Sequence, residues 1–137
     1  MATFSRFEDI EAWQGARAIA REIYRITNLG PFARDFGLRD QVRRAAVSVM
    51  ANIAEGFGRG GNREFAQFLG HARGSIAELR SHLYVAIDAA LVEESVANEI
   101  MSQASRVEAQ ITGLITYLTK TEMRGSRLRP QNVEPRT

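Results

Sequence analysis

Apolar residues recur at intervals of three and four along most of this chain, and that spacing places them on one side of an α-helix. Four such segments are separated by short polar or glycine-containing breaks. They predict helices at about residues 8–27, 38–57, 62–90 and 93–121. No segment alternates apolar and polar residues with a period of two, so we predict no β-strand.

The breaks between the predicted helices contain residues that end helices. Gly30 suits a helix C-terminus, and Pro31 cannot continue the helix before it. The later connections are also short, and short connections place consecutive helices side by side in opposite directions. We therefore predict an all-α fold, an antiparallel up-down-up-down four-helix bundle that forms a single domain over residues 1–121.

The second break contains the spacing Gly56-x-Gly58-x-x-Gly61, which matches the dinucleotide-binding fingerprint. That motif acts between a β-strand and a helix, where backbone amides meet a pyrophosphate. Here the motif follows a predicted helix, and no strand is expected. We interpret it as a turn between helices whose glycines accept positive φ.

Polar residues stand beside apolar ones in the second and third predicted helices. Ser48 and Asn52 are neighbours of core positions, and so are Ser75 and Glu78. Buried polar groups must find partners, so we expect the two helices to face each other there, with Asn52 or Arg44 meeting Glu78. The predicted structural network consists of Gln41, Arg44, Ser48, Asn52, Glu55, Ser75 and Glu78.

His71, Ser75, Glu78 and His82 share one stripe of the third helix, since they are spaced by four, three and four residues. This is the best constellation in the chain for metal binding or acid–base chemistry. It holds too few ligands for a closed metal site, and no nucleophile stands beside a base. We predict no catalytic residue, no metal and no cofactor.

Composition and charge add further limits. The chain has no Cys, and its net charge of +2 comes from 18 basic and 16 acidic residues. Residues 121–137 hold four arginines and two glutamates, which leaves the preceding residues neutral by count. From residue 122 the apolar period ends, so we predict a disordered basic tail over 122–137. No signal peptide or membrane span is expected, and the predicted location is the cytoplasm.

Several large apolar residues lie off or at the edge of the main apolar stripes. We expect them to be exposed in a single bundle, whereas Trp13 and Tyr24 fit the apolar repeat of the first helix. A helix that is apolar on more than one face has a second partner. These residues therefore predict a homo-oligomer built on the outer faces, and they are Ile19, Ile26, Phe57, Phe68 and Met101.

One combination of residues resembles a known family over roughly residues 7–120. It resembles the four-helix-bundle family of 23S rRNA intervening-sequence proteins, also called S23 proteins. The resemblance implies a ring-like homopentamer without an assigned enzymatic activity, similar to the accessory variability protein of diversity-generating retroelements, which binds nucleic acid and a reverse transcriptase. The residues that carry it are Phe7-Glu8-Asp9-Ile10-Glu11-Ala12-Trp13, Phe36-Gly37-Leu38, Gln41, Arg44-Ala45, Ser48-Val49, Asn52-Ile53-Ala54-Glu55-Gly56, Phe65, Phe68-Leu69, Ala72, Gly74-Ser75 and Glu78.

These observations favour a non-enzymatic, homopentameric scaffold that contacts RNA or DNA. Arginine pairs with phosphate through two parallel hydrogen bonds, and a ring would repeat each arginine cluster. Two alternatives stay open: a protein-binding adaptor without nucleic-acid contact and, less favoured, an enzyme with a polar site between helices. The candidate nucleic-acid-binding residues are Arg39, Arg43, Arg59, Arg63, Arg124, Arg127 and Arg129.

Overall fold

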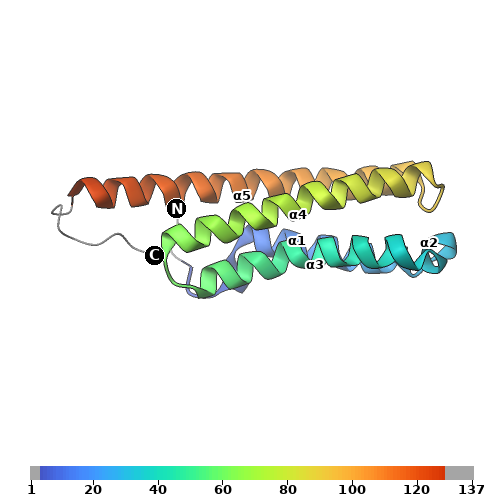
Figure 1. The fold of residues 1–137 in the computed structure, drawn as a ribbon, viewed down its shortest axis with the longest axis horizontal. Helices are drawn as coiled ribbons and strands as arrows, with labels where there is room; N and C mark the ends of the chain where they lie inside the picture. The colour runs from blue at the N-terminus through green and yellow to red at the C-terminus, as the bar shows by residue number, and fades with distance from the viewer. Residues whose placement is uncertain (1–3, 129–137) are drawn as a thin grey trace.

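The computed structural model describes the backbone of residues 4–128 and the side chains of residues 4–120. It is all-α, with no strand among the described residues, and four long helices run along a common axis (Figure 1). The elements are the 3-10 helix η1 (Phe7–Asp9) and the α-helices α1 (Glu11–Thr27), α2 (Gly30–Arg34), α3 (Phe36–Gly58), α4 (Asn62–Asp88) and α5 (Glu94–Leu128).

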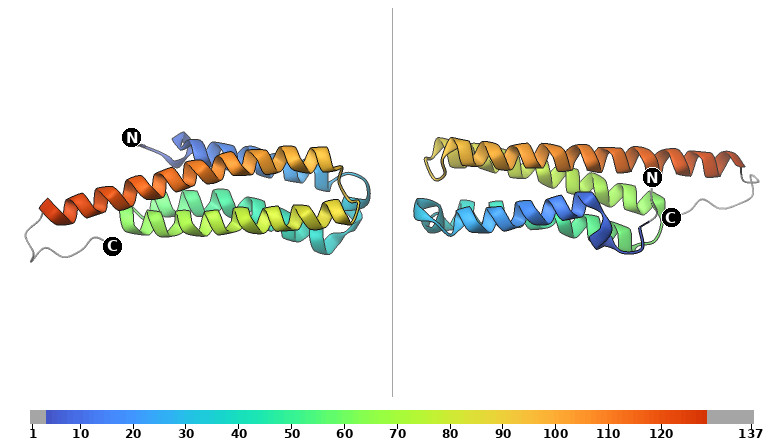
Figure 2. Two further views of the ribbon diagram at one scale, coloured as in Figure 1. Left: turned by 90° about the horizontal axis from the view of Figure 1, so that it is seen from above. Right: turned by 180° about the vertical axis from the view of Figure 1, so that it is seen from behind.

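The long helices form a closed four-membered bundle. Both α3 and α5 pack against α1 on one side and against α4 on the other. Figure 2 shows the same pairs side by side in views from above and from behind. Consecutive long helices run in opposite directions, because each connection turns the chain back, so the predicted four-helix bundle is confirmed.

The core is made of the apolar residues that face the bundle axis. Its largest fully buried side chains include Ile23 of α1, Ile53 of α3, Leu69 of α4 and Ile111 of α5. Burial of such a side chain contributes roughly 1.5–3 kcal/mol. The main apolar stripe of each long helix is therefore buried within the bundle of a single chain.

Two residues predicted to be exposed are part of this core. Ile19 is 1% exposed and Ile26 is 5% exposed, so neither forms an outer apolar face. The prediction was wrong because α1 contacts α3, α5, α2 and η1 together, which widens its buried stripe. Phe57 and Met101 are half-buried and pack against the core. Tyr24, which was expected in the core, is 43% exposed.

The connection between α1 and α3 contains the short helix α2, which the sequence analysis did not predict. Pro31 lies in the first turn of α2, where a proline is tolerated because its missing N–H would have no partner. Phe32 of this short helix is fully buried. Asp35 then caps α3, since its side chain accepts a hydrogen bond of 3.1 Å from the backbone N–H of Leu38. Helix α3 thus begins at Phe36.

Helix α5 continues to Leu128, so residues 122–128 are helical and not part of a disordered tail. Figures 1 and 2 show its last turns extending beyond the ends of the other helices. The sequence permits this because no proline interrupts it before Pro130, and helices end at or before the residue that precedes a proline. The rest of the predicted tail, 129–137, lies outside the described residues.

Helix α3 approaches α4 closely at Gly56. A Cβ atom at this position would lie 2.6 Å from the Cβ of Phe68 and 3.2 Å from Cδ1 of Phe65. The ring of Phe57 meets that of Phe65 edge-on, with 5.9 Å between centroids. Gly56 therefore allows this aromatic cluster to form, while Gly60, with φ of 86°, turns the chain into α4. The motif Gly56-x-Gly58-x-x-Gly61 is a turn between helices, as expected, but its own glycines do not take positive φ. Gly56 and Gly58 lie within α3, and Gly61 has a φ of −103°.

A small polar cluster also joins α3 to α4. Ser48 Oγ accepts hydrogen bonds from Ser75 Oγ at 2.9 Å and from Asn52 Nδ2 at 3.0 Å. Asn52 Nδ2 also donates to the backbone carbonyl of Ser48 at 2.8 Å. All three side chains are half-buried, so the shared hydroxyl of Ser48 holds the cluster together.

Replacing Gly56 with Ala should destabilise the fold. The added methyl group overlaps an atom close to the α4 backbone, a contact that costs about 1–3 kcal/mol, and the better helix propensity of Ala offsets at most about 1 kcal/mol of it. Chemical denaturation measures the change. The matched control is Gly113→Ala, because a Cβ there meets nothing within 4 Å; it should be neutral or stabilising. Equal effects of the two changes would contradict the packing described for Gly56.

Ser48→Ala should lower the free energy of unfolding by about 1–3 kcal/mol relative to Ser81→Ala, because it removes the acceptor shared by Ser75 and Asn52. Ser81 is an exposed helical serine, so the two substitutions gain the same helix propensity. Thermal or urea unfolding of both variants gives the difference. If the two variants have the same free energy of unfolding, the cluster contributes nothing to stability.

Candidate nucleic-acid interface

Among residues 1–120, whose charges sum to zero, positive charge is concentrated in residues 11–44. Residues 11–44 hold seven arginines and four acidic residues, a net charge of +3, whereas residues 45–120 hold six basic and eight acidic residues, a net charge of −2. The positive segment comprises α1, α2 and the first part of α3, which lie side by side in the bundle (Figure 1). Although residues 1–120 carry no net charge, the part of the bundle formed by α1, α2 and the start of α3 is therefore positive.

A surface hollow of about 350 Å³ lies between α1 and α3 on this side. We call it the α1–α3 hollow. It is open to solvent, and two of its residues, Tyr24 and Val47, are large exposed apolar side chains. Its lining consists of Tyr24, Asp40, Arg43, Arg44 and Val47.

Arg43 is held in place at the edge of the α1–α3 hollow. Its Nε donates to Thr27 Oγ1 at 2.8 Å, and its Nη2 donates to Asn28 Oδ1 at 2.8 Å. Thr27 is fully buried and donates in turn to the carbonyl of Ile23 at 2.6 Å. The Arg43 guanidinium carbon lies 4.5 Å from the centroid of the Tyr24 ring, within the range of a cation–π contact.

Two further arginine–aromatic pairs lie on α1 and at the start of α3. The Arg39 guanidinium lies 4.8 Å from the Phe36 ring centroid, and that of Arg17 lies 5.8 Å from the Trp13 ring. Arg39 is partly neutralised, because its Nε lies 3.2 Å from Asp40 Oδ1. Three of the four cation–π contacts found among the described residues thus involve α1 or the start of α3.

Two exposed arginines complete this side. Arg21 precedes Tyr24 by three residues on α1, which places it on the same stripe, and Arg44 lines the hollow from α3. Neither is joined to a described residue by a salt bridge, although many of their neighbours are paired. Their charges are therefore available to a phosphate. We define the arginine face as Arg17, Arg21, Tyr24, Arg43 and Arg44.

The sequence-predicted arginines do not form one site. Arg39 and Arg43 lie beside the hollow, but Arg59 follows the opposite end of α3, roughly 24 Å from Arg43 along the helix, and Arg63 lies in the first turn of α4. Arg59 is paired with Glu55 at 2.6 Å, and this hydrogen bond raises the pKa of its guanidinium. Arg25 has its pKa raised in the same way by Glu22.

The remaining three candidates cannot be placed in the same manner. Arg124 and Arg127 belong to the last turns of α5, beyond the side chains that the structure describes, and Arg129 lies outside the described residues. Arg63 is exposed on α4. Sequence reasoning missed Arg17 and Arg21, although the net charge of residues 11–44 could have indicated them.

The predicted polar network is smaller than expected. Gln41, Arg44 and Glu55 are exposed, and only Ser48, Asn52 and Ser75 bond to one another. The predicted contact of Asn52 or Arg44 with Glu78 is wrong, because Glu78 Oε1 lies instead near His82 Nε2 of its own helix, at 3.8 Å. His82 is four residues after Glu78 on the same helix, so the two side chains are neighbours and Glu78 does not extend to α3.

The histidine stripe does not assemble a metal site. His71 packs edge-on against Phe68, with 5.8 Å between ring centroids. Within residues 4–120 no three His, Cys, Asp or Glu side chains come together as potential ligands.

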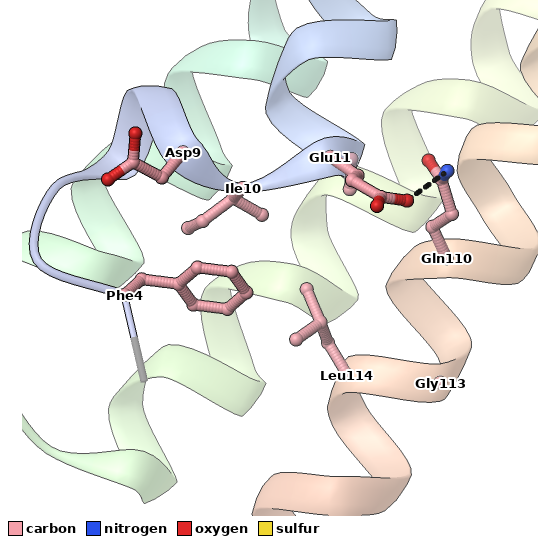
Figure 3. A pocket seen from close by; sticks show the side chains of 8 residues that line it. Phe4, Asp9, Ile10, Glu11, Gln110, Gly113 and Leu114 are labelled. Atoms are coloured by element: carbon pink, nitrogen blue, oxygen red, sulfur yellow. Dashed lines mark hydrogen bonds between the residues drawn. The ribbon is translucent and has the colours of Figure 1, made fainter. Parts of the chain in front are cut away.

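A second hollow, of about 430 Å³, lies between the start of α1 and α5 (Figure 3). Phe4, Ile10 and Leu114 form its apolar wall, and no arginine or lysine lines it. Glu11 at its rim accepts a hydrogen bond of 3.4 Å from Gln110. An apolar hollow with an acidic rim does not suit a phosphate, so the arginine face is the better nucleic-acid candidate.

The helices were also compared with the requirements for a membrane span. None of the helices, within the portion of the chain described, combines the length and the apolar character needed to cross a bilayer.

Comparison with known proteins supports the fold. A solved structure of a protein of unknown function, from the S23 ribosomal protein family of Bacteroides thetaiotaomicron VPI-5482, superposes with a TM-score of 0.69 at 18% sequence identity, covering 76% of this chain and 97% of that one. No curated protein gives a significant sequence match. The family model of the 23S rRNA-intervening sequence proteins matches residues 8–113. The chain therefore belongs to the family of 23S rRNA-intervening sequence proteins.

Proposed function

We propose that this chain is a non-enzymatic, self-assembling helical scaffold that binds RNA or DNA through the arginine face. The observation that carries the proposal is the unpaired charge of Arg21 and Arg44 beside the α1–α3 hollow, on the side where the net charge is positive. Contacts between arginine and phosphate release counterions and supply most non-specific affinity for nucleic acid.

Self-assembly is the second part of the proposal. Gly70 and Gly74 lie in the middle of α4, and a Cβ at either position would meet nothing within 4 Å. A glycine inside a helix costs about 1 kcal/mol relative to alanine, and no contact within the chain explains that cost here. A helix of another copy packed closely on this face would explain it. The stoichiometry implied by the family resemblance is a ring of five.

A ring would strengthen nucleic-acid binding without new contacts. Cyclic symmetry repeats the arginine face on every subunit, and a strand held by one face meets the next at a high effective concentration. A few phosphate contacts per subunit are then enough for stable binding. Location in the cytoplasm, where RNA and DNA are accessible, is part of the same proposal.

The second candidate function is a protein-binding adaptor. It is favoured by the hollow between α1 and α5, whose apolar wall and acidic rim suit a segment with apolar and basic side chains (Figure 3). Partners that stay bound after nuclease treatment, and that are lost on Leu114→Glu, would support the adaptor. Partners that nuclease releases would support the nucleic-acid scaffold.

Replacing both Arg21 and Arg44 with Ala should weaken nucleic-acid binding. Loss of two phosphate contacts should make the slope of log K against log salt less steep by about 1.5. Fluorescence anisotropy at several salt concentrations measures both quantities. The control is the double variant Arg63→Ala with Arg106→Ala, which removes the same charge from exposed positions on α4 and α5. Equal losses in both double variants would show that only total charge matters and would contradict the proposed face.

Gly74→Leu should break the assembly, because its side chain fills the space that a neighbouring helix would occupy. Native mass spectrometry should show a pentamer for the unmodified protein and smaller species for this variant. Thr116→Leu, at an exposed position of α5 that is not a glycine, should keep the pentamer. A monomeric unmodified protein, or a Gly74→Leu variant that assembles normally, would contradict self-assembly through α4.

A further inference from the structure

We propose that the α1–α3 hollow selects single-stranded nucleic acid, with a base stacked on the ring of Tyr24. This inference rests on the proposed function, because it names the class of nucleic acid that the arginine face takes. Single strands are bound by aromatic side chains that stack on bases, in a positively charged groove that follows the backbone. The α1–α3 hollow contains both of these features.

Tyr24 has the geometry of a stacking platform. One face of its ring is covered by the Arg43 guanidinium at 4.5 Å, yet the side chain remains 43% exposed. Exposed aromatic residues are normally mobile, but this one is backed by an arginine with two hydrogen bonds of 2.8 Å. A base would therefore stack on a ring that is already in position, which reduces the entropy lost on binding.

The charges around Tyr24 suit the backbone that accompanies such a base. Arg44 lines the same hollow, and Arg21 lies one turn away on α1. Asp40 is also present, but its carboxylate lies 3.2 Å from Arg39 Nε, so its charge is compensated. A carboxylate at this position could accept a hydrogen bond from the exocyclic amino group of a stacked base, as acidic residues do with cytosine.

A second platform lies nearby. Phe36 is 64% exposed and is backed by the Arg39 guanidinium at 4.8 Å. Phe36 and Arg43 are separated by roughly 10 Å along α3. A second arginine-backed ring two helical turns from Arg43 would give a further base a platform.

A duplex does not offer the same contacts. Its bases are stacked on one another, so reaching the face of a ring would require a base to be turned out of the helix. Tyr24 offers the face of its ring and not a group that reads base edges, and one face already lies against Arg43. The arginines would still contact duplex phosphates, but the tyrosine would add nothing.

The test compares labelled single-stranded and duplex DNA of the same sequence and length, using fluorescence anisotropy with the full-length protein. Tyr24→Ala should weaken single-strand binding by about tenfold or more, the loss expected for one stacked base, and should leave duplex binding nearly unchanged. Tyr24→Phe should retain single-strand binding. The matched control is Tyr117→Ala, because Tyr117 is a similarly exposed tyrosine on α5, at 40%. Mass photometry of each variant reports assembly.

The outcomes separate the two proposals. If the unmodified protein binds neither probe, the proposed function and this inference both fail. If it binds both probes equally, and Tyr24→Ala changes the affinity no more than Tyr117→Ala does, binding through the arginine face is retained. The proposal that a base stacks on Tyr24 is then overturned. If Tyr24→Ala changes the assembly and not the affinity per assembled particle, the hollow is a contact between copies of this chain, and the inference is also overturned.

Discussion

The packing of α3 against its two neighbours determines where everything else in this protein lies. On one side, Gly56 brings the α3 backbone so close to Phe65 and Phe68 that no Cβ fits between them. On the other side, Arg43 reaches from α3 to the buried Thr27 of α1. The contact with α4 is apolar and requires that residue 56 has no Cβ atom. The contact with α1 is polar and rests on the hydrogen bond between Arg43 and the buried Thr27. Together they fix the position of α3 between α4 and α1.

The arginine face follows from the second of these contacts. Because Thr27 and Asn28 hold Arg43 at the end of α1, the guanidinium is placed over Tyr24 instead of moving freely in solvent. Arg44, the next residue on α3, then lines the hollow. The function we propose therefore uses side chains whose positions are set by the bundle itself.

The bundle could be predicted from the sequence because the apolar repeats of three and four residues report directly which side of each helix is buried. The same repeats misplaced particular residues. Tyr24 fits the apolar spacing but is exposed, because its ring lines the open hollow between α1 and α3 instead of the bundle core. Ile26 falls outside the main stripe but is buried, since α1 is surrounded on several sides. Periodicity gives the direction of a side chain on its helix, but not how many neighbours the helix has. The candidate arginines separate because Arg39 and Arg43 lie near the start of α3, whereas Arg59 and Arg63 lie at its far end and in α4. The hydrogen-bonded polar network contains only Ser48, Asn52 and Ser75.

The central claim is that nucleic acid lies on the α1–α3 side of the bundle. Photochemical crosslinking of the assembled protein to a bound strand, followed by mass spectrometry of the crosslinked peptides, tests this claim without altering any residue. The account predicts crosslinks within residues 11–47, with Tyr24 among the modified positions. Crosslinks confined to α4 and α5, or a bound strand that yields none on α1 and α3, would contradict it.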